Sequence, residues 1–161
     1  MRVAVICLLC IILAVNLYLI TAQLTDKNNL PKIFGFAAVI VISGSMEPAI
    51  EAGDLIIIKE QGEYKEDDIV TYRSGPTLIT HRIVAINASE VITRGDANNA
   101  EDAPVVLSAL EGKVVLNIPE AGKFLLFLKT PTGILTASCL VLVCFFLARA
   151  VQKLKREKKT V

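Results

Sequence analysis

Two long uncharged runs limit what this 161-residue chain can fold into more than any other feature. Residues 3–22 and 131–148 contain no Asp, Glu, Lys or Arg and consist mostly of Leu, Ile, Val and Ala. At about 1.5 Å rise per residue, helices of these lengths match the ~30 Å hydrocarbon core of a bilayer, the second only just. We therefore expect an N-terminal transmembrane anchor over residues 1–22 and a C-terminal transmembrane helix over residues 131–150, with the lipid bilayer as a partner.

Each run has a second interpretation. The first is compatible with a cleavable signal peptide, although the apolar region of such a peptide usually has ~7–15 residues. In addition, Ile20-Thr21-Ala22 carries a bulky residue where a cleavage site favours a small one. The second run can be a buried core helix or a re-entrant hairpin, but the basic residues after it favour a span that stops at the cytoplasmic face.

The formal charge of +1 is the balance of three unequal parts. The N-terminal flank carries Arg2, and the segment 23–130 carries ten Lys or Arg against fifteen Asp or Glu. Residues 149–159 carry six Lys or Arg against one Glu. Because basic flanks favour the cytoplasmic side, we expect both termini in the cytoplasm, including a basic tail over residues 151–161. Residues 23–130 then form an extracytoplasmic domain at the plasma membrane, with the endoplasmic reticulum membrane as the alternative. This topology explains the basic tail without a nucleic-acid partner.

All four cysteines, Cys7, Cys10, Cys139 and Cys144, lie in the two apolar runs. The segment 23–130 therefore has none for a disulfide, a thiol nucleophile or a zinc site. Any chemistry of this domain must rest on other residue types, and we expect neither a metal nor a cofactor.

The segment 23–130 has the pattern of a mainly β domain. Short β-branched runs are separated by Gly, Pro, Asn and acidic clusters, and they cover residues 33–42, 54–59, 68–73, 77–86, 91–94 and 112–118. The absence of a segment with helical period between them favours a small antiparallel sheet or barrel over βαβ units. A domain of ~108 residues can hold one small core. The apolar residues 124–128 precede the second run, and we expect them at the membrane interface.

Two single residues of this domain can carry chemistry. Ser45 ends the Ser-Gly-Ser turn after the first strand; such a turn is usually only a polar turn, and a serine hydroxyl needs an adjacent base to become reactive. His81 is the only histidine, and strand alternation assigns it to the face of Ile79 and Ile83. A lone histidine is commonly structural, but its ordinary pKa of ~6.5 makes it the best proton acceptor available to a serine.

An Asp- and Asn-rich loop over residues 94–102 is the third feature. It can be a solvated turn or a calcium site, although it lacks the Gly at the sixth position and the Glu at the twelfth of an EF-hand loop. In a third interpretation, Asp96 or Asp102 orients His81 and stabilises its imidazolium. Together the three features give the ordered set Ser, His and Asp.

Four ordered segments resemble the characteristic boxes of type I signal peptidases. They are Ser-Gly-Ser-Met-Glu-Pro at 43–48, Gly-Asp-Leu-Ile-Ile-Ile at 53–58, Thr-His-Arg-Ile at 80–83, and Thr-Arg-Gly-Asp-Ala-Asn-Asn at 93–99 with Asp102 after it. Residues 112–119 resemble the next box, so the resemblance covers roughly residues 33–130. The usual bacterial branch has a lysine where this chain has His81. The sequence is therefore similar to the Ser–His branch, which includes endoplasmic-reticulum and archaeal enzymes and a minority of Gram-positive enzymes related to sporulation and biofilm matrix secretion.

The resemblance assigns a role to each matching position. It implies that Ser45 is the nucleophile, His81 the general base and Asp102 the functional acid. Asp96 matches a second, supporting acid. Ser43 matches a position whose hydroxyl can join the Ser45 backbone N–H in an oxyanion hole.

The same resemblance implies a membrane-bound serine endopeptidase. Such an enzyme removes N-terminal signal peptides from secreted preproteins after small residues at positions −3 and −1, and the secretion translocon is a further candidate partner. Two alternatives stay open. One is a catalytically inactive membrane subunit or binding module that retains the fold, and the other is a self-processing Ser–Lys protease that uses Lys59 or Lys65.

Overall fold

The computed structural model describes Cys7, Tyr18, Thr21 and residues 30–157. The expected anchor over residues 1–22 lies outside the described residues except at those three positions, and the expected basic tail is described only as far as residue 157. The chain divides into two compact units between Pro119 and Glu120, and each is considered separately below.

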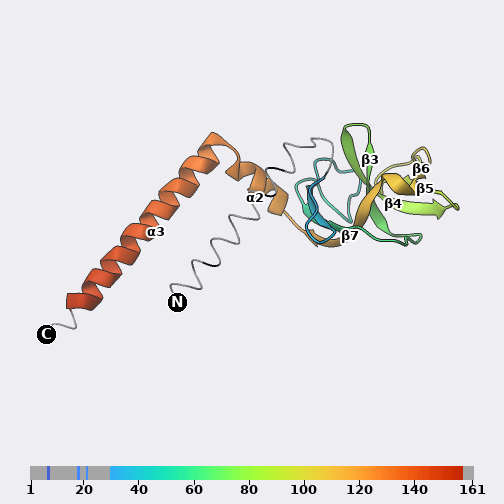
Figure 1. Cartoon of the computed structure of the whole chain (residues 1–161). Coiled ribbons are helices and arrows are strands. Elements are labelled where there is room, and N and C mark those ends of the chain that lie inside the picture. The colour runs from blue at the N-terminus through green and yellow to red at the C-terminus, as the bar shows by residue number, and fades with distance from the viewer. Residues whose placement is uncertain (1–6, 8–17, 19–20, 22–29, 158–161) are drawn as a thin grey trace. The chain divides into compact units, whose positions relative to one another are not determined.

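The described residues of the first unit contain one antiparallel sheet of seven strands (Figure 1). The strands are β1 (Phe36–Ile40), β2 (Leu55–Lys59), β3 (Ile69–Ser74), β4 (Thr77–Ile86), β5 (Glu90–Arg94), β6 (Val105–Val106) and β7 (Leu110–Ile118). Their order is β1-β2-β7-β3-β4-β5-β6, so the last strand of the chain lies near the middle of the sheet. The prediction of a β-rich antiparallel domain is confirmed.

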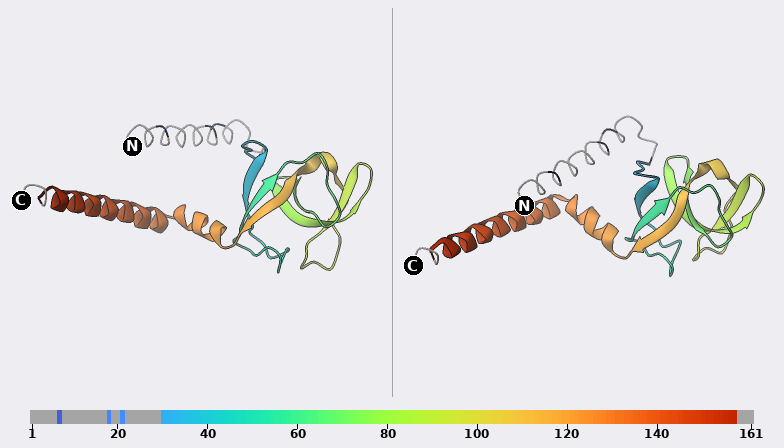
Figure 2. Two further views of the ribbon diagram at one scale, coloured as in Figure 1. Left: turned by 90° about the horizontal axis from the view of Figure 1, so that it is seen from below. Right: turned by 60° about the horizontal axis from the view of Figure 1, so that its bottom comes forward.

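The sheet is strongly curved. Register shifts interrupt three strand pairs, at Ile57/Ile58, Thr71/Tyr72 and Ile83/Ala85. Bulges of this kind bend a strand and increase its twist. Figure 2 shows the result: β3, β4 and β5 curl away from the end of the sheet that carries β1 and β2.

The interior of the curved sheet contains two buried apolar clusters, whereas the sequence predicted one small core. The first packs side chains of β1 and β2 with those of the loop that joins them: Ala37, Val41, Met46, Ile50, Ile56 and Ile58. The second packs side chains of β3, β4, β5 and β7: Val70, Tyr72, Ile83, Val91 and Leu110.

The first strand is shorter than the apolar run that predicts it. Phe34 and Gly35 have φ angles of 52° and 79°, in the left-handed region that strands avoid. Ile33 and Phe36 exchange both backbone hydrogen bonds across this turn, at 2.8 and 2.9 Å. The turn therefore delays the start of β1 to Phe36. The two-residue strand β6 and the 3-10 helix η1 (Leu107–Ala109) are too short to leave a periodic pattern in the sequence.

The second unit contains the helices α2 (Ala121–Leu128) and α3 (Pro131–Glu157). The sequence did not predict α2, because eight residues are too few to establish a helical period. Its location at a membrane interface stays a prediction. In α3, the stretch Pro131–Arg149 is long and apolar enough to cross a membrane and is almost entirely exposed. It is the one helix of this kind among the described residues, so the two transmembrane helices of the expected fold are not shown.

Candidate active site

Ser45 lies in the loop that joins β1 to β2, and both ends of this loop are fixed. The Val41 N–H donates to the Asp54 carbonyl at 2.9 Å, and the Gly53 N–H donates to the Val41 carbonyl at 2.7 Å. Within the loop, Met46 and Ile50 are 1% and 2% exposed and pack into the first apolar cluster. Because the residue after Ser45 is anchored in the core, Ser45 is held half-buried at the end of the sheet.

The buried carboxylate of Asp54 also fixes the loop that carries Ser45. Asp54 is 4% exposed, and its Oδ2 accepts hydrogen bonds from the Glu51 N–H at 3.1 Å and from Asn117 Nδ2 at 2.8 Å. Asn117 belongs to β7, so this contact ties the serine loop to the middle of the sheet.

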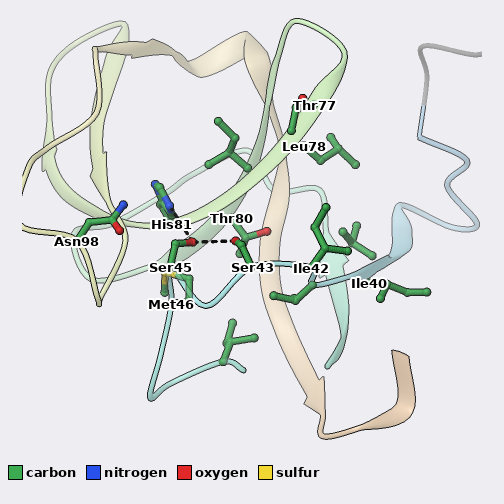
Figure 3. A pocket seen from close by; sticks show the side chains of 14 residues that line it. Ile40, Ile42, Ser43, Ser45, Met46, Thr77, Leu78, Thr80, His81 and Asn98 are labelled. Atoms are coloured by element: carbon green, nitrogen blue, oxygen red, sulfur yellow. Dashed lines mark hydrogen bonds between the residues drawn. The ribbon is translucent and has the colours of Figure 1, made fainter. Parts of the chain in front are cut away.

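His81 lies on β4, where it is paired with Val70 of β3 and is 6% exposed. Its Nε2 is 3.2 Å from Ser45 Oγ, and Figure 3 shows the two side chains facing each other. As strand alternation predicts, the neighbouring Ile83 is also buried, whereas Arg82 points to the other face and contacts different partners.

Asp102 completes the arrangement behind the histidine. Its Oδ2 is 2.5 Å from His81 Nδ1 and also accepts hydrogen bonds from Thr93 Oγ1 at 2.7 Å and Tyr72 Oη at 3.1 Å. A carboxylate can only accept, so the histidine Nδ1 carries the proton. In the neutral imidazole with this tautomer, the lone pair of Nε2 is directed at the Ser45 hydroxyl, which is the arrangement required of a general base.

The electrostatics of Asp102 fit this state. Burial acts to raise the pKa of the carboxyl, but the hydrogen bonds from His81, Thr93 and Tyr72 and the positive charge that His81 can carry act to lower it. The lowering causes prevail, so the pKa of Asp102 lies below its ordinary value and the group is ionised at neutral pH. Burial, with the nearby Asp102 charge, raises the pKa of Tyr72, which stays a hydrogen-bond donor.

The structure separates the two acids of the Asp-rich loop. Asp96 forms a two-pronged ion pair with Arg82, in which Nε donates to Oδ1 at 2.9 Å and Nη2 donates to Oδ2 at 2.6 Å. Arg82 also donates to the Asp67 carbonyl at 3.0 Å. Of the two predicted candidates, Asp102 contacts His81, whereas Asp96 is engaged by the guanidinium.

The loop after β5 also contacts the serine turn directly. The Ala97 N–H donates to the Ser45 carbonyl at 2.9 Å. A Cβ at Gly95 would lie 2.5 Å from that carbonyl oxygen, closer than real Cβ atoms approach. Only glycine therefore allows the two loops to come this close.

Ser43 lies on the other side of Ser45, with 3.4 Å between the two hydroxyl oxygens (Figure 3). Ser43 is exposed. The Ser45 backbone N–H donates to no backbone carbonyl within the described part of the chain. These two donors are the ones that the sequence predicted for an oxyanion hole.

An apolar cavity of about 370 Å³ opens beside Ser45 and His81. It runs between the end of β1 and the first half of β4, and it is lined by Val39, Ile40, Val41, Ile42, Ser43, Ser45, Met46, Ile50, Thr77, Leu78, Ile79, Thr80, His81 and Asn98. Residues 77–81 of β4 have no partner on β5, whose pairing begins at Arg82. Neither Lys59 nor Lys65, the candidate bases of a Ser–Lys protease, lines the cavity.

Sequence reasoning missed three residues of this site. Tyr72 lies thirty residues from Asp102 along the chain, and no sequence signal links the two. Thr93 was noted only as the first residue of the segment 93–99. Its position on the inward face of the predicted strand at 91–94 could have indicated a buried hydroxyl. Asn98 was read as part of a polar loop, and only the folded chain brings it to the cavity.

No group of three or more His, Cys, Asp or Glu in the described ranges is arranged to hold a metal ion. The carboxylates of the Asp-rich loop that could have bound calcium, Asp96 and Asp102, are engaged by Arg82 and His81.

Fold and site together have the form of a serine hydrolase: a small antiparallel β domain in which serine, histidine and aspartate are linked in that order. Comparison with known proteins shows which proteins the chain is similar to. The chain is 37% identical over 102 residues to signal peptidase I W of Bacillus subtilis, covering 58% of this chain and 54% of that protein. It is 38% identical over 73 residues to the signal peptidase complex catalytic subunit SEC11 of Metarhizium acridum, covering 40% of this chain and 42% of that one. It is 34% identical over 101 residues to SEC11 of Verticillium alfalfae, covering 52% and 59%.

The chain thus spans about half the length of the curated relatives it matches. No family model matches it. The resemblance found in the sequence is confirmed: the chain is similar to a type I signal peptidase, signal peptidase I W, and to SEC11 subunits of the signal peptidase complex.

Proposed function

We propose that this protein is a membrane-bound serine endopeptidase that removes N-terminal signal peptides from preproteins. One observation carries the proposal: the unbroken contact from Ser45 Oγ through both ring nitrogens of His81 to Asp102. The relatives are named as signal peptidases, which agrees with the substrate class.

In the proposed mechanism, His81 Nε2 takes the Ser45 hydroxyl proton while the oxygen attacks the scissile carbonyl. His81 then gives this proton to the leaving amine, and the signal peptide stays on Ser45 as an ester. A water molecule, deprotonated by the same Nε2, hydrolyses the ester and restores the serine. Asp102 remains ionised throughout and stabilises the imidazolium that forms twice in the cycle.

The developing negative charge on the substrate oxygen needs preorganised donors. We assign this role to the Ser45 backbone N–H, which has no carbonyl partner within the described residues, and to the Ser43 hydroxyl. Loss of one such donor typically lowers kcat by ~10²–10³. The Ser43 hydroxyl must rotate toward the substrate, because in the free protein it lies beside Ser45 Oγ.

The substrate binds as an extended strand in the cavity. The stretch 77–81 of β4 lacks a partner on β5, so its backbone groups can pair with a substrate strand. The family resemblance implies small residues at positions −1 and −3, and the apolar lining by side chains such as Ile42, Met46 and Leu78 is compatible with apolar residues there. We assign the preprotein as the partner of this surface, and the secretion translocon stays a further candidate partner of the protein.

The membrane brings enzyme and substrate together. The apolar stretch of α3 serves as one anchor, and the sequence pattern predicts the other over residues 1–22. With both termini cytoplasmic, Ser45 lies at the outer surface of the plasma membrane, where the end of a signal peptide emerges.

The test is cleavage of a preprotein by the purified full chain in detergent, read by mass spectrometry. Ser45→Ala and His81→Ala should each lower the rate by at least ~10³, whereas Ser89→Ala, an exposed serine in the β4–β5 turn, should leave it unchanged. Full activity of either site variant overturns the mechanism. A wild-type chain that binds preproteins without cleaving them would instead be an inactive binding subunit.

A further inference from the structure

Among the residues that the structure describes, Asn98 is the only one whose side-chain amide lines the cavity beside Ser45. Figure 3 shows it on the opposite side of Ser45 from Ser43 and next to His81. It is exposed, and its side chain forms no hydrogen bond with any residue that the structure describes. A donor and an acceptor are therefore open to a ligand at the edge of the reactive centre.

The backbone around this amide is fixed relative to the nucleophile. The Asn98 N–H closes a turn on the Gly95 carbonyl at 2.9 Å, and the preceding Ala97 N–H holds the Ser45 carbonyl at 2.9 Å. The position that a Cβ on Gly95 would occupy lies 2.5 Å from the Ser45 carbonyl oxygen and 2.8 Å from Asn98 Nδ2. The free amide thus lies close to the serine backbone without being bonded to it.

The shape of the cavity indicates which part of a substrate meets Asn98. The apolar lining, with Ile40, Ile42 and Leu78, extends from Ser45 on the side of Ser43 (Figure 3). The acyl part of a bound polypeptide fills that side. The leaving part must then continue past His81, which gives the proton to the leaving amine, and run along Asn98.

We propose that Asn98 binds the leaving polypeptide by hydrogen-bonding the first peptide unit after the scissile bond. A peptide unit offers one N–H and one C=O, and the side-chain amide offers the complementary pair. This inference rests on the proposed function and extends it, since it assigns recognition of the mature part of the preprotein to a residue outside the Ser, His and Asp set.

The experiment compares two substrates with the same acyl sequence, using the full chain in detergent. One continues for several residues past the cut, and in the other an aminocoumarin amide replaces everything after the cut. Asn98→Ala should lower kcat/KM about tenfold on the long peptide, the ratio expected for one lost hydrogen bond, and by less than about twofold on the coumarin amide. Asn99→Ala, the exposed neighbour that does not line the cavity, should change neither by more than about twofold.

Each outcome decides the inference. If Asn98→Ala lowers kcat/KM by the same factor on both substrates, Asn98 acts on the serine loop. If the variant cleaves both substrates as fast as the wild type, Asn98 does not contact the substrate. Either result overturns the proposal. Cleavage by the wild-type chain that is lost in Ser45→Ala tests the proposed function separately. If the wild-type chain cleaves neither substrate, the proposed function fails and the role of Asn98 fails with it.

Discussion

A single carboxylate oxygen, Asp102 Oδ2, accepts hydrogen bonds from the side chains of His81, Thr93 and Tyr72. Asp96 makes a contact of similar length, but with Arg82 on the opposite face of β4. The two acids lie six residues apart in one loop and have unlike surroundings. Their variants should therefore behave differently.

We expect Asp102→Asn to lower kcat by roughly 10³–10⁴, because an amide that donates to Nδ1 favours the wrong histidine tautomer. Asp96→Asn removes a charge from an ion pair outside the contact chain and should cost about tenfold or less. Rates on a preprotein, with Tm as a check of folding, measure both. The assignment of the two acids is wrong if Asp96→Asn shows the larger loss.

Thr93→Val removes the completely buried hydroxyl that donates to Asp102. The pKa of Asp102 is lowered in the folded protein, so its carboxylate stabilises the fold above the ordinary pKa, and this contribution is lost as the pH falls through the lowered value. The variant raises that pKa. We expect a loss of about 1 kcal/mol in unfolding free energy near neutral pH and a smaller loss in acid.

Urea unfolding of Thr93→Val at several pH values measures this difference. Thr77→Val, at an exposed position of β4, is the control and should show no pH dependence. A loss that is equal at all pH values would mean that Thr93 contributes packing only.

At the scale of elements, the loop after β5 and the loop that carries Ser45 pack so closely that residue 95 has no room for a side chain. Gly95→Ala places a methyl group 2.5 Å from the Ser45 carbonyl oxygen, which must move. We expect at least about a tenfold loss of kcat, since small displacements of a reacting group are costly. Gly62→Ala, where a Cβ meets nothing within 4 Å, should retain full activity. Equal activity of the two variants would contradict the proposed coupling of the loops.

Elements with a clear period were predictable from the sequence, and those defined by turns or by long-range contacts were not. The apolar, β-branched run at 77–86 gives β4 its observed bounds, because turn-forming residues, Gly75 and Pro76 before it and Asn87 after it, limit it at both ends. The run at 33–42 loses its first three residues to a left-handed turn. The chemistry of Ser45 and His81 marked them as a possible pair, whereas the choice of Asp102 over Asp96 came from the family resemblance. The contact of Tyr72 exists only after β3 is brought beside the loop.

At the scale of the whole molecule, the exposed apolar stretch of α3 predicts the reactivity of its cysteines. Cys139 and Cys144 are free and exposed, and they lie in the stretch Pro131–Arg149. In intact vesicles, a membrane-impermeant maleimide should label neither, because the bilayer covers both. After detergent is added, the labelling should rise severalfold. A chain with Cys7→Ala and Cys10→Ala isolates this signal, and strong labelling before detergent would argue against a span.

The contact between Asp102 and His81 also limits which amino acid can serve as the base at position 81. A lysine ammonium beside a carboxylate has a raised pKa, so it would remain a cation near neutral pH and could not receive the serine proton. An imidazole can accept at one nitrogen while donating from the other, so the same carboxylate supports it. Substitution of lysine at position 81 alone, with Asp102 kept in the contact it makes here, would therefore favour a salt bridge over proton transfer from Ser45.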